Sequence, residues 1–342
     1  MLTYYELLRR TSRTFAVGIE ALPSPLRDAV TLAYLVLRVS DYFEDSPTLG
    51  KQKKSDCLEQ WADLLQVEPE ARAPSAIRRL ADAVAEADRD LPDRLAAREA
   101  GRILSGLDQL SPELRDPIRH HTASTTLGMV RWIRRGDDFP DEEALDDYMF
   151  EVAGRVGLLL TDLFCTYSPA IERRREALLE TAVSFGLGLQ TVNVIRGLHE
   201  DPERGWNYVP RHLLAGSLSN PTLELRELDS EHQRRILDFL VAKAGGHIED
   251  ALTYCRTLPR FQRGTRIFCI IPALLALRTA ELSRDNPEVF RSPVKVPRRT
   301  VGRLVVASRL LFFSNAWLDR HRARARALTH PGVGRRVGGR SG

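Results

Sequence analysis

The sequence predicts an all-α protein, because apolar residues recur every three or four positions along almost the whole chain. No alternating apolar and polar run indicates a strand, and no repeat of solenoid length is present. Prolines, glycines and short polar segments separate the helical stretches, and no long linker divides them. We therefore expect a single helical domain over residues 1–319.

In the first half of the chain, the period predicts helices over 4–10, 25–46, 57–65, 76–87, 94–110 and 118–135. Residues 50–54 are expected to form a polar loop. Ser24 is a candidate N-cap for the second of these helices, with Pro25 in its first turn. Pro47 disfavours helical geometry at Ser46, so this helix should end there.

In the second half, the period predicts helices over 142–164, 171–198, 231–258, 265–282 and 300–317. Gly154 and Gly157 lie inside the first of these, where each costs about 1 kcal/mol relative to alanine. Such a cost indicates that another helix or a ligand approaches closely at these positions.

The charge balance argues against a nucleic-acid-binding surface. The formal net charge is +4, and the seven arginines after Asp319, with no acid among them, more than supply it. This composition, rich in Arg and Gly, predicts a disordered tail over 320–342.

The sequence also bears on location. The N-terminus lacks the layout of a secretion signal. The longest apolar run, 267–277, has about half of the roughly 20 residues needed to span a bilayer. The four cysteines lack a CxxC pair, so neither zinc nor a disulfide framework is indicated. We expect a cytoplasmic protein with no transmembrane segment and at most peripheral membrane contact.

Two acid clusters are the strongest chemical signal. Asp41, Glu44 and Asp45 share one helix face at the end of an apolar helix, where the helix dipole disfavours anions. Glu200 and Asp201 end a second apolar helix in the same manner. Facing each other across a pocket, the clusters would bind a hard divalent cation such as Mg²⁺. Two solvated helix ends are the other interpretation of each cluster alone.

Such a site suits a substrate with a phosphate leaving group, whose charge a metal neutralises. Arg38 and Arg196 lie close before the two clusters, where they can contact phosphate or pair with the neighbouring acids. The apolar remainder of these helices suits a hydrocarbon chain and a carbocation. His120, His121 and His199 are candidates for proton transfer or for structural roles, and His199 lies within the second cluster.

Several segments together resemble the squalene/phytoene synthase family, and its squalene-synthase branch in particular, from about Thr11 to Val305. The segment 11–15 is similar to the family's phosphate-binding S-R-[ST]-F motif, and 34–45 to its first aspartate-rich motif. Tyr148 and the V-A-G at 152–154 resemble its catalytic-tyrosine segment, and 190–201 its second acidic motif. Segments 268–272 and 294–296 resemble the part near the NADPH site and the flap after it.

The resemblance implies an isoprenoid synthase (class I terpenoid synthase) helical bundle around a central pocket. It also implies Mg²⁺-assisted loss of diphosphate from an allylic prenyl diphosphate. The implied metal ligands are Asp41, Asp45 and Asp201, with Glu44 and Glu200 assisting. The implied diphosphate-binding residues are Ser12, Arg13, Tyr34, Arg38, Asn193 and Arg196. Tyr148 would orient the acceptor or handle a proton, and the expected pocket residues are Phe15, Val152, Gly154, Gln190, Gly197 and Phe268.

One departure from the family pattern shapes the functional prediction. Gly197 stands where the second motif has its first aspartate, which removes a metal ligand and should open space beside the cation. Phe150 and Glu151 also replace a tyrosine expected just before V-A-G. The leading interpretation is therefore transfer of one prenyl group to a carbon of an aromatic small molecule, such as a carbazole or indole, in bacterial secondary metabolism. Tyr42 and Phe43 would shorten the prenyl channel and favour a short donor.

Two alternatives stay open. A head-to-head squalene or presqualene diphosphate synthase would use two farnesyl diphosphates and NADPH, and Phe268, Cys269 and Lys295 favour it. A non-catalytic family member would bind prenyl lipids or a partner enzyme. The acceptor, the donor chain length and the oligomeric state are not predicted.

Overall fold

The computed structural model describes residues 2–85, 88, 91–136, 139–202, 206–214 and 225–330, without the side chains of Arg13 and Thr14. Every regular element in these ranges is helical, which confirms the all-α prediction. The first half contains α1 (Tyr4–Thr11), α2 (Arg13–Ile19), α3 (Leu26–Asp45), α4 (Lys51–Gln66), η1 (Pro69–Ala71), α5 (Pro74–Asp82), α6 (Arg94–Arg98), α7 (Ala100–Asp108) and α8 (Pro112–Arg135). The second half contains α9 (Glu142–Met149), η3 (Phe150–Gly154), α10 (Arg155–Tyr167), α11 (Pro169–Glu172), α12 (Arg175–Gly197), η5 (Arg211–Leu214), η6 (Leu225–Glu227), α13 (Ser230–Thr257), α14 (Arg263–Ser283), η7 (Pro287–Phe290), α15 (Arg298–Leu311) and α16 (Asn315–Arg326).

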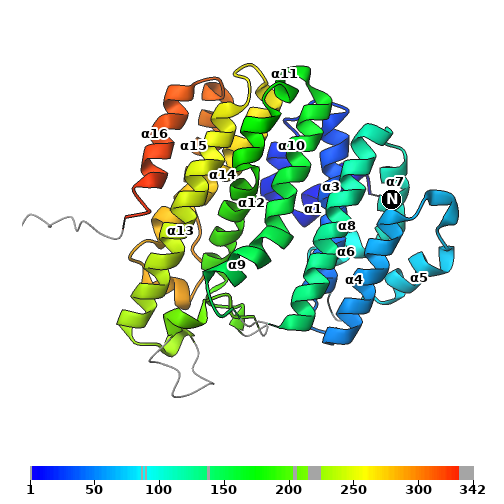
Figure 1. Cartoon of the computed structure of the whole chain (residues 1–342), viewed down its shortest axis with the longest axis horizontal. Helices are drawn as coiled ribbons and strands as arrows, with labels where there is room; N and C mark the ends of the chain where they lie inside the picture. The colour runs from blue at the N-terminus through cyan, green and yellow to red at the C-terminus, as the bar shows by residue number, and fades with distance from the viewer. Residues whose placement is uncertain are drawn as a thin grey trace, which may run out of the picture.

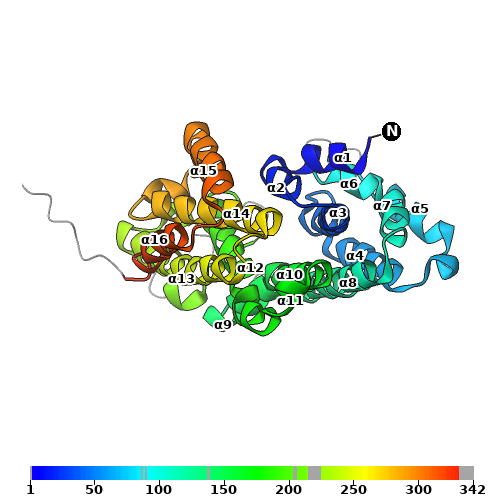
Figure 2. The ribbon, with the colours of Figure 1, turned by 90° about the horizontal axis from the view of Figure 1, so that it is seen from above.

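The helices form a closed ring when the bundle is seen from above (Figure 2). Around this ring, α3 packs on α8, α8 on α10, α10 on α12, α12 on α14, α14 on α2, and α2 again on α3. The long helices stand roughly upright in Figure 1, so the ends of α3 and α12 that carry the two acid clusters both point downward. The ring therefore brings together two segments about 150 residues apart in the sequence.

Glycines allow two helical backbones to touch on one side of the ring. A Cβ at Gly157 would lie 1.8 Å from the carbonyl oxygen of Ala182, and one at Gly186 would lie 2.1 Å from that of Ala153. The close approach predicted at Gly157 is thus confirmed, and the neighbour is α12. Gly154 also packs against α12, through the side chains of Val183 and Leu187.

Helix boundaries differ from the predictions where packing interrupts the period. The predicted helix 142–164 contains the π-helical segment η3, and the predicted helices 94–110 and 300–317 are each two helices. Residues 51–54, predicted as loop, form the first turn of α4. Ser24 does not cap α3, because its hydroxyl is hydrogen-bonded to the Asp28 side chain instead.

The prediction of a disordered tail from residue 320 was wrong for residues 320–330. Residues 315–326 form α16, which packs on α13 and buries Leu318 and Ala325. Three of its four arginines are neutralised, since Arg322 and Arg326 pair with Glu249 and Arg324 pairs with Glu281. Residues 331–342, the rest of the predicted tail, lie outside the described residues.

Helix α12 is the one helix of the described ranges that is long and apolar enough to cross a membrane. It packs against α10, α13 and α14, and most of its apolar stretch is buried in the protein. Its apolar character is therefore accounted for by its position in the core.

Candidate active site

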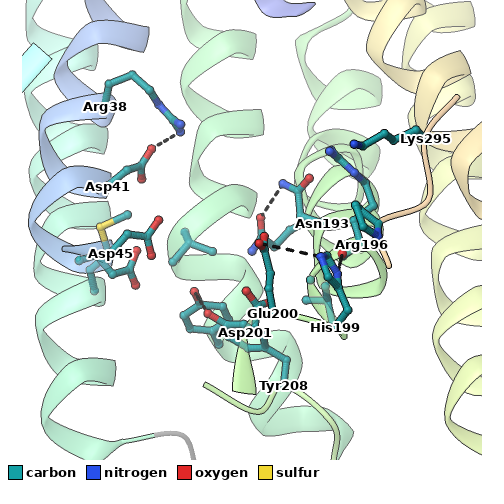
Figure 3. A pocket seen from close by; sticks show the side chains of 18 residues that line it. Arg38, Asp41, Asp45, Asn193, Arg196, His199, Glu200, Asp201, Tyr208 and Lys295 are labelled. Carbon is teal, nitrogen blue, oxygen red and sulfur yellow. Dashed lines mark hydrogen bonds and ion pairs between the residues drawn. The ribbon is translucent and has the colours of Figure 1, made fainter. Parts of the chain in front are cut away.

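A polar cavity of about 480 Å³ lies between the acidic ends of α3 and α12. Figure 3 shows Asp41 and Asp45 on one wall and Glu200 and Asp201 on the other. The lining residues are Arg38, Asp41, Glu44, Asp45, Met129, Tyr148, Val152, Gln190, Asn193, Val194, Arg196, Gly197, His199, Glu200, Asp201, Tyr208, Pro293 and Lys295. The structure therefore places the two clusters on facing walls, the arrangement that a shared cation site requires.

The α3 wall holds buried carboxylates whose negative charge the neighbouring protein groups do not fully neutralise. Glu44 is 5% exposed, and its Oε1 has no hydrogen-bond partner. Burial raises the pKa of Glu44 well above its ordinary value, and Asp45 and Asp41 add to the shift. Burial also raises the pKa of Asp41 to about 7, although the Arg38 charge opposes this. A cation on this wall would relieve both penalties.

These acids fit a magnesium ion that takes some of its ligands from water and substrate better than they fit a metal coordinated only by protein side chains. Within the described ranges, no three His, Cys, Asp or Glu side chains converge tightly enough to hold a metal. Magnesium is usually bound by one or two carboxylates together with water and substrate phosphate oxygens. The facing carboxylates match that donor set.

Arg38 joins the acid wall to a residue that sequence reasoning missed. Its guanidinium pairs with Asp41, lies 3.5 Å from Asp93 and stacks over the ring of Tyr34. Burial raises the pKa of Asp93. No sequence pattern signals Asp93, because it meets Arg38 only through the packing of α6 on α3.

The other predicted diphosphate residues divide into two groups. Asn193 and Arg196 line the polar cavity together with Arg38. Ser12 lines neither this cavity nor the chamber described below; it caps α2 by accepting a hydrogen bond from the backbone of Phe15. The Arg13 side chain lies outside the described part of the structure. Lys295, from the predicted flap, supplies a further cation at the cavity.

An aromatic wall borders the acids. The hydroxyls of Tyr148 and Tyr208 are 3.0 Å apart, and their rings stack at 5.0 Å. The Trp206 ring lies 5.7 Å from that of Tyr208 and almost parallel to it. Burial, with the nearby Glu44 charge, raises the pKa of both tyrosines well above its ordinary value, so their hydroxyls stay protonated. Sequence reasoning missed Trp206 and Tyr208, although two aromatic residues within seven positions after the second acid cluster were a usable signal.

An apolar chamber of about 180 Å³ opens from the polar cavity. It shares Arg38, Asp41, Val152, Gln190 and Asn193 with that cavity. Its apolar lining includes Phe15, Tyr34, Leu37, Val156, Leu160, Leu189, Phe268 and Pro272. Of the predicted pocket residues, Gly154 lines neither space and belongs to the helix contact with α12.

Tyr42 and Phe43 do not shorten this chamber. Both are fully buried on the far side of α3 and neither lines the chamber. The Tyr42 hydroxyl donates to Asp88, and burial raises its pKa to about 12. Their predicted role in donor selection is therefore wrong, because they belong to the core.

Comparison with known proteins agrees with this arrangement. The family model described as squalene/phytoene synthase matches residues 8–300. The chain belongs to the squalene/phytoene synthase family. Members of this family are prenyltransferases, and the resemblance seen in the motifs is confirmed.

Individual relatives point to one branch of this family. The chain is 31% identical to squalene synthase of Candida albicans over 329 residues, covering 90% of this chain and 67% of the relative. It is 31% identical to that of Saccharomyces cerevisiae over 326 residues, covering 91% and 68%. It is 28% identical to human squalene synthase over 297 residues, covering 86% and 66%. The chain thus spans about two thirds of each relative.

Solved structures agree on the fold. TcSQS in complex with a ligand superposes with a TM-score of 0.73 at 24% identity, covering 95% of this chain and 97% of that one. A dehydrosqualene synthase gives a TM-score of 0.59 at 16% identity, covering 91% and 95%. These likenesses confirm the class I terpenoid synthase fold. The relatives favour the squalene-synthase interpretation over an aromatic acceptor.

Glu151, which replaces the family's tyrosine, forms ion pairs with two arginines. Its carboxylate accepts from Arg155 at 2.7 Å and from Arg131 at 3.2 Å, and it lies against Gly128 of α8. The side chain is buried and does not line the cavity. This departure from the squalene/phytoene synthase pattern therefore ties η3 to α8.

Gly197, the other departure, does not open space. The turn after α12 folds back, with the amides of Glu200 and Asp201 donating to the Gly197 carbonyl at 2.9 and 2.8 Å. A Cβ at Gly197 would lie 1.9 Å from a carboxylate oxygen of Asp201. The predicted vacancy is wrong, because Asp201 fills it.

Proposed function

We propose that this chain ionises an allylic prenyl diphosphate in the polar cavity and joins its C1 carbon to a second prenyl diphosphate, as in head-to-head squalene-type synthesis. The observation that carries the proposal is the pair of facing acid walls at the mouth of an apolar chamber. The facing acid walls suit a metal-bound diphosphate, and the apolar chamber suits a prenyl chain. The squalene synthases among the relatives favour the second prenyl diphosphate as acceptor.

The residues divide the work of binding. Asp41, Asp45 and Asp201 would hold Mg²⁺, with Glu44 and Glu200 assisting. The metal, when bound, would neutralise the charge that develops on the leaving diphosphate. Arg38, Arg196 and Lys295 would contact phosphate oxygens directly. Because Arg38 pairs with Asp41, a phosphate bound to the guanidinium would compete with that pair and help to free an acid for the metal.

The coupling of the two prenyl diphosphates requires no oxidant or reductant. The C–O bond of the donor breaks, and its electron pair leaves with the diphosphate. The π electrons of the acceptor double bond form the new C–C bond, and a proton then leaves the product. The aromatic faces of Tyr148 and Tyr208 would stabilise the cation, and the apolar chamber would keep water away from it. Formation of squalene would also require hydride from NADPH.

Transfer to an aromatic acceptor is the second candidate, and the chamber volume favours it. A cavity of about 150 Å³ accommodates a benzene molecule. The chamber of about 180 Å³ is therefore sized for one short prenyl chain in this conformation, and two farnesyl chains require it to open. Such a reaction needs one ionisation and no NADPH.

A product assay separates the two. The protein is incubated with Mg²⁺ and farnesyl diphosphate, with or without NADPH, and in parallel with dimethylallyl, geranyl or farnesyl diphosphate plus indole, carbazole or phenol acceptors. Presqualene diphosphate or squalene from farnesyl diphosphate alone supports the first proposal. A prenylated aromatic formed without NADPH supports the second. Failure to release diphosphate from any donor contradicts both and favours a binding protein.

A further inference from the structure

Helix α15 presents large apolar side chains to solvent. Val306 is 55% exposed and Leu310 is 66% exposed, and Phe313, just after the helix, is 46% exposed. Only Ser308 of this helix is buried, and its main packing partner is α14. Figure 2 shows α15 projecting from the bundle. This face is therefore apolar without being part of the core.

The same helix carries positive charge that nothing nearby neutralises. It has four arginines, Arg298, Arg299, Arg303 and Arg309, and the sequence contains no acid from residue 289 to 318. Within the described ranges, no carboxylate forms an ion pair with any of them, whereas three arginines of the neighbouring α16 are paired with Glu249 or Glu281. The arginines of α15 thus keep a positive charge that the three paired arginines of α16 have lost to neighbouring acids.

Charge and apolar surface follow one stripe. Arg299, Arg303, Val306, Leu310 and Phe313 succeed one another at spacings of four and three residues, which places them along one side of the helix. The arginines occupy its first half and the apolar residues its second half. Arginine stems can lie along an apolar surface while their head groups reach anionic partners.

A further exposed aromatic lies at the apolar end of the stripe. Phe261, in the loop between α13 and α14, is 87% exposed. Arg266 ties this loop to the start of α16, two residues after Phe313, because its guanidinium donates to the Leu258 carbonyl and to the Asn315 side chain, both at 2.9 Å. Phe261 and Phe313 therefore belong to the same end of the molecule.

We infer that α15 and Phe261 form a docking surface for an anionic lipid bilayer, with the apolar end inserted at the headgroup boundary and the arginines over anionic headgroups. A basic helix with exposed apolar side chains is the pattern of an interfacial helix. Each arginine near an anionic membrane surface adds electrostatic attraction. Charge complementarity thus selects an anionic membrane over a neutral one.

Docking at this surface would bear on the active site. Lys295 lines the polar cavity and lies three residues before α15, so the docked helix is joined directly to one edge of the cavity. An amphiphilic substrate or product would then reach the cavity from the membrane surface. The docking surface itself does not depend on which prenyl acceptor is used.

The test is co-sedimentation of the full chain with vesicles of phosphatidylcholine alone or with phosphatidylglycerol, at low and high salt. The double variant Arg299→Gln/Arg303→Gln should lower the partition coefficient on anionic vesicles at least tenfold. The double variant Leu310→Ser/Phe313→Ser should lower it as well. Circular dichroism and thermal unfolding check that the variants remain folded.

Matched controls lie on other faces. Arg78→Gln/Arg79→Gln on α5 removes the same two charges, and Leu127→Ser/Leu179→Ser removes two exposed leucines. Both controls should bind anionic vesicles as the parent does. Equal losses in variants and controls, or no binding of the parent to anionic vesicles, would overturn the inference. A concentration-dependent dimer abolished by Leu310→Ser/Phe313→Ser would assign the face to a second copy instead.

Discussion

The carboxylate of Asp201 occupies the volume that a side chain at Gly197 would fill. An added Cβ would lie 1.9 Å from Asp201 Oδ2 and 2.6 Å from its carboxyl carbon. Since the clashing group is the end of a side chain rather than backbone, it can rotate away at a modest cost. One carboxylate thus stands where the family pattern has room for two.

Replacing this glycine should change metal dependence in a way that depends on the new side chain. Gly197→Ala displaces Asp201 without adding a ligand, so the Mg²⁺ concentration for half-maximal diphosphate release should rise about tenfold or more. Gly197→Asp restores an acid and should lower that concentration relative to Gly197→Ala. The control is Gly50→Asp, where an added Cβ meets nothing within 4 Å. An unchanged Mg²⁺ titration in both variants would argue against the assigned metal wall.

Replacing Glu44 should make the protein more stable but less active. Its carboxylate is buried beside Asp41 and Asp45, and one of its oxygens lacks a partner, so its charge is costly in the metal-free protein. Glu44→Gln should therefore raise the melting temperature of the metal-free protein by about 2 °C or more while lowering Mg²⁺-dependent turnover. Differential scanning fluorimetry with and without Mg²⁺ measures the first effect. A lower melting temperature would mean that the carboxylate is already satisfied.

His247 should make the protein sensitive to acid. Its ring lies between α12 and α13, 3.2 Å from the Thr191 hydroxyl. Burial lowers its pKa to about 4, and the Lys243 charge adds to the shift. The folded state therefore favours the neutral ring, so its stability is unaffected above about pH 6.5 and falls by up to about 3 kcal/mol as the pH drops towards 4.

Urea unfolding at pH 7.5 and pH 5 measures this loss. His247→Gln should reduce the difference in unfolding free energy between the two pH values, whereas a substitution of the exposed His120 should leave it unchanged. A variant that loses as much stability on acidification as the parent would rule out His247 as the source.

The glycine contacts between α10 and α12 should tolerate no added carbon. Gly157→Ala would place a methyl group 1.8 Å from a backbone oxygen, which only a shift of the helices can relieve. We expect a loss of at least about 2 kcal/mol in unfolding free energy. Gly246→Ala in α13 is the matched control, since its new carbon would meet only Thr329 at 3.9 Å. It should be neutral or stabilising, because alanine favours a helix.

The all-α class, most helix positions and the two acid clusters could be predicted from the sequence. These features depend on neighbours three or four residues apart, and that spacing is set within a single helix. The placement of Asp41, Glu44 and Asp45 on one wall is such a local property. So is the end of α3 at Asp45, before Pro47.

Tertiary packing alone decided the rest. The Asp93 contact with Arg38, the aromatic wall of Trp206 and Tyr208, and the filling of the Gly197 space join residues whose separation no periodicity records. The same holds for α16, whose arginines suggested disorder although Glu249 and Glu281 on other helices neutralise three of them. Sequence alone determined which groups each helix presents. The ring of helices decided which groups meet, because burial and charge pairing act between elements far apart in the chain.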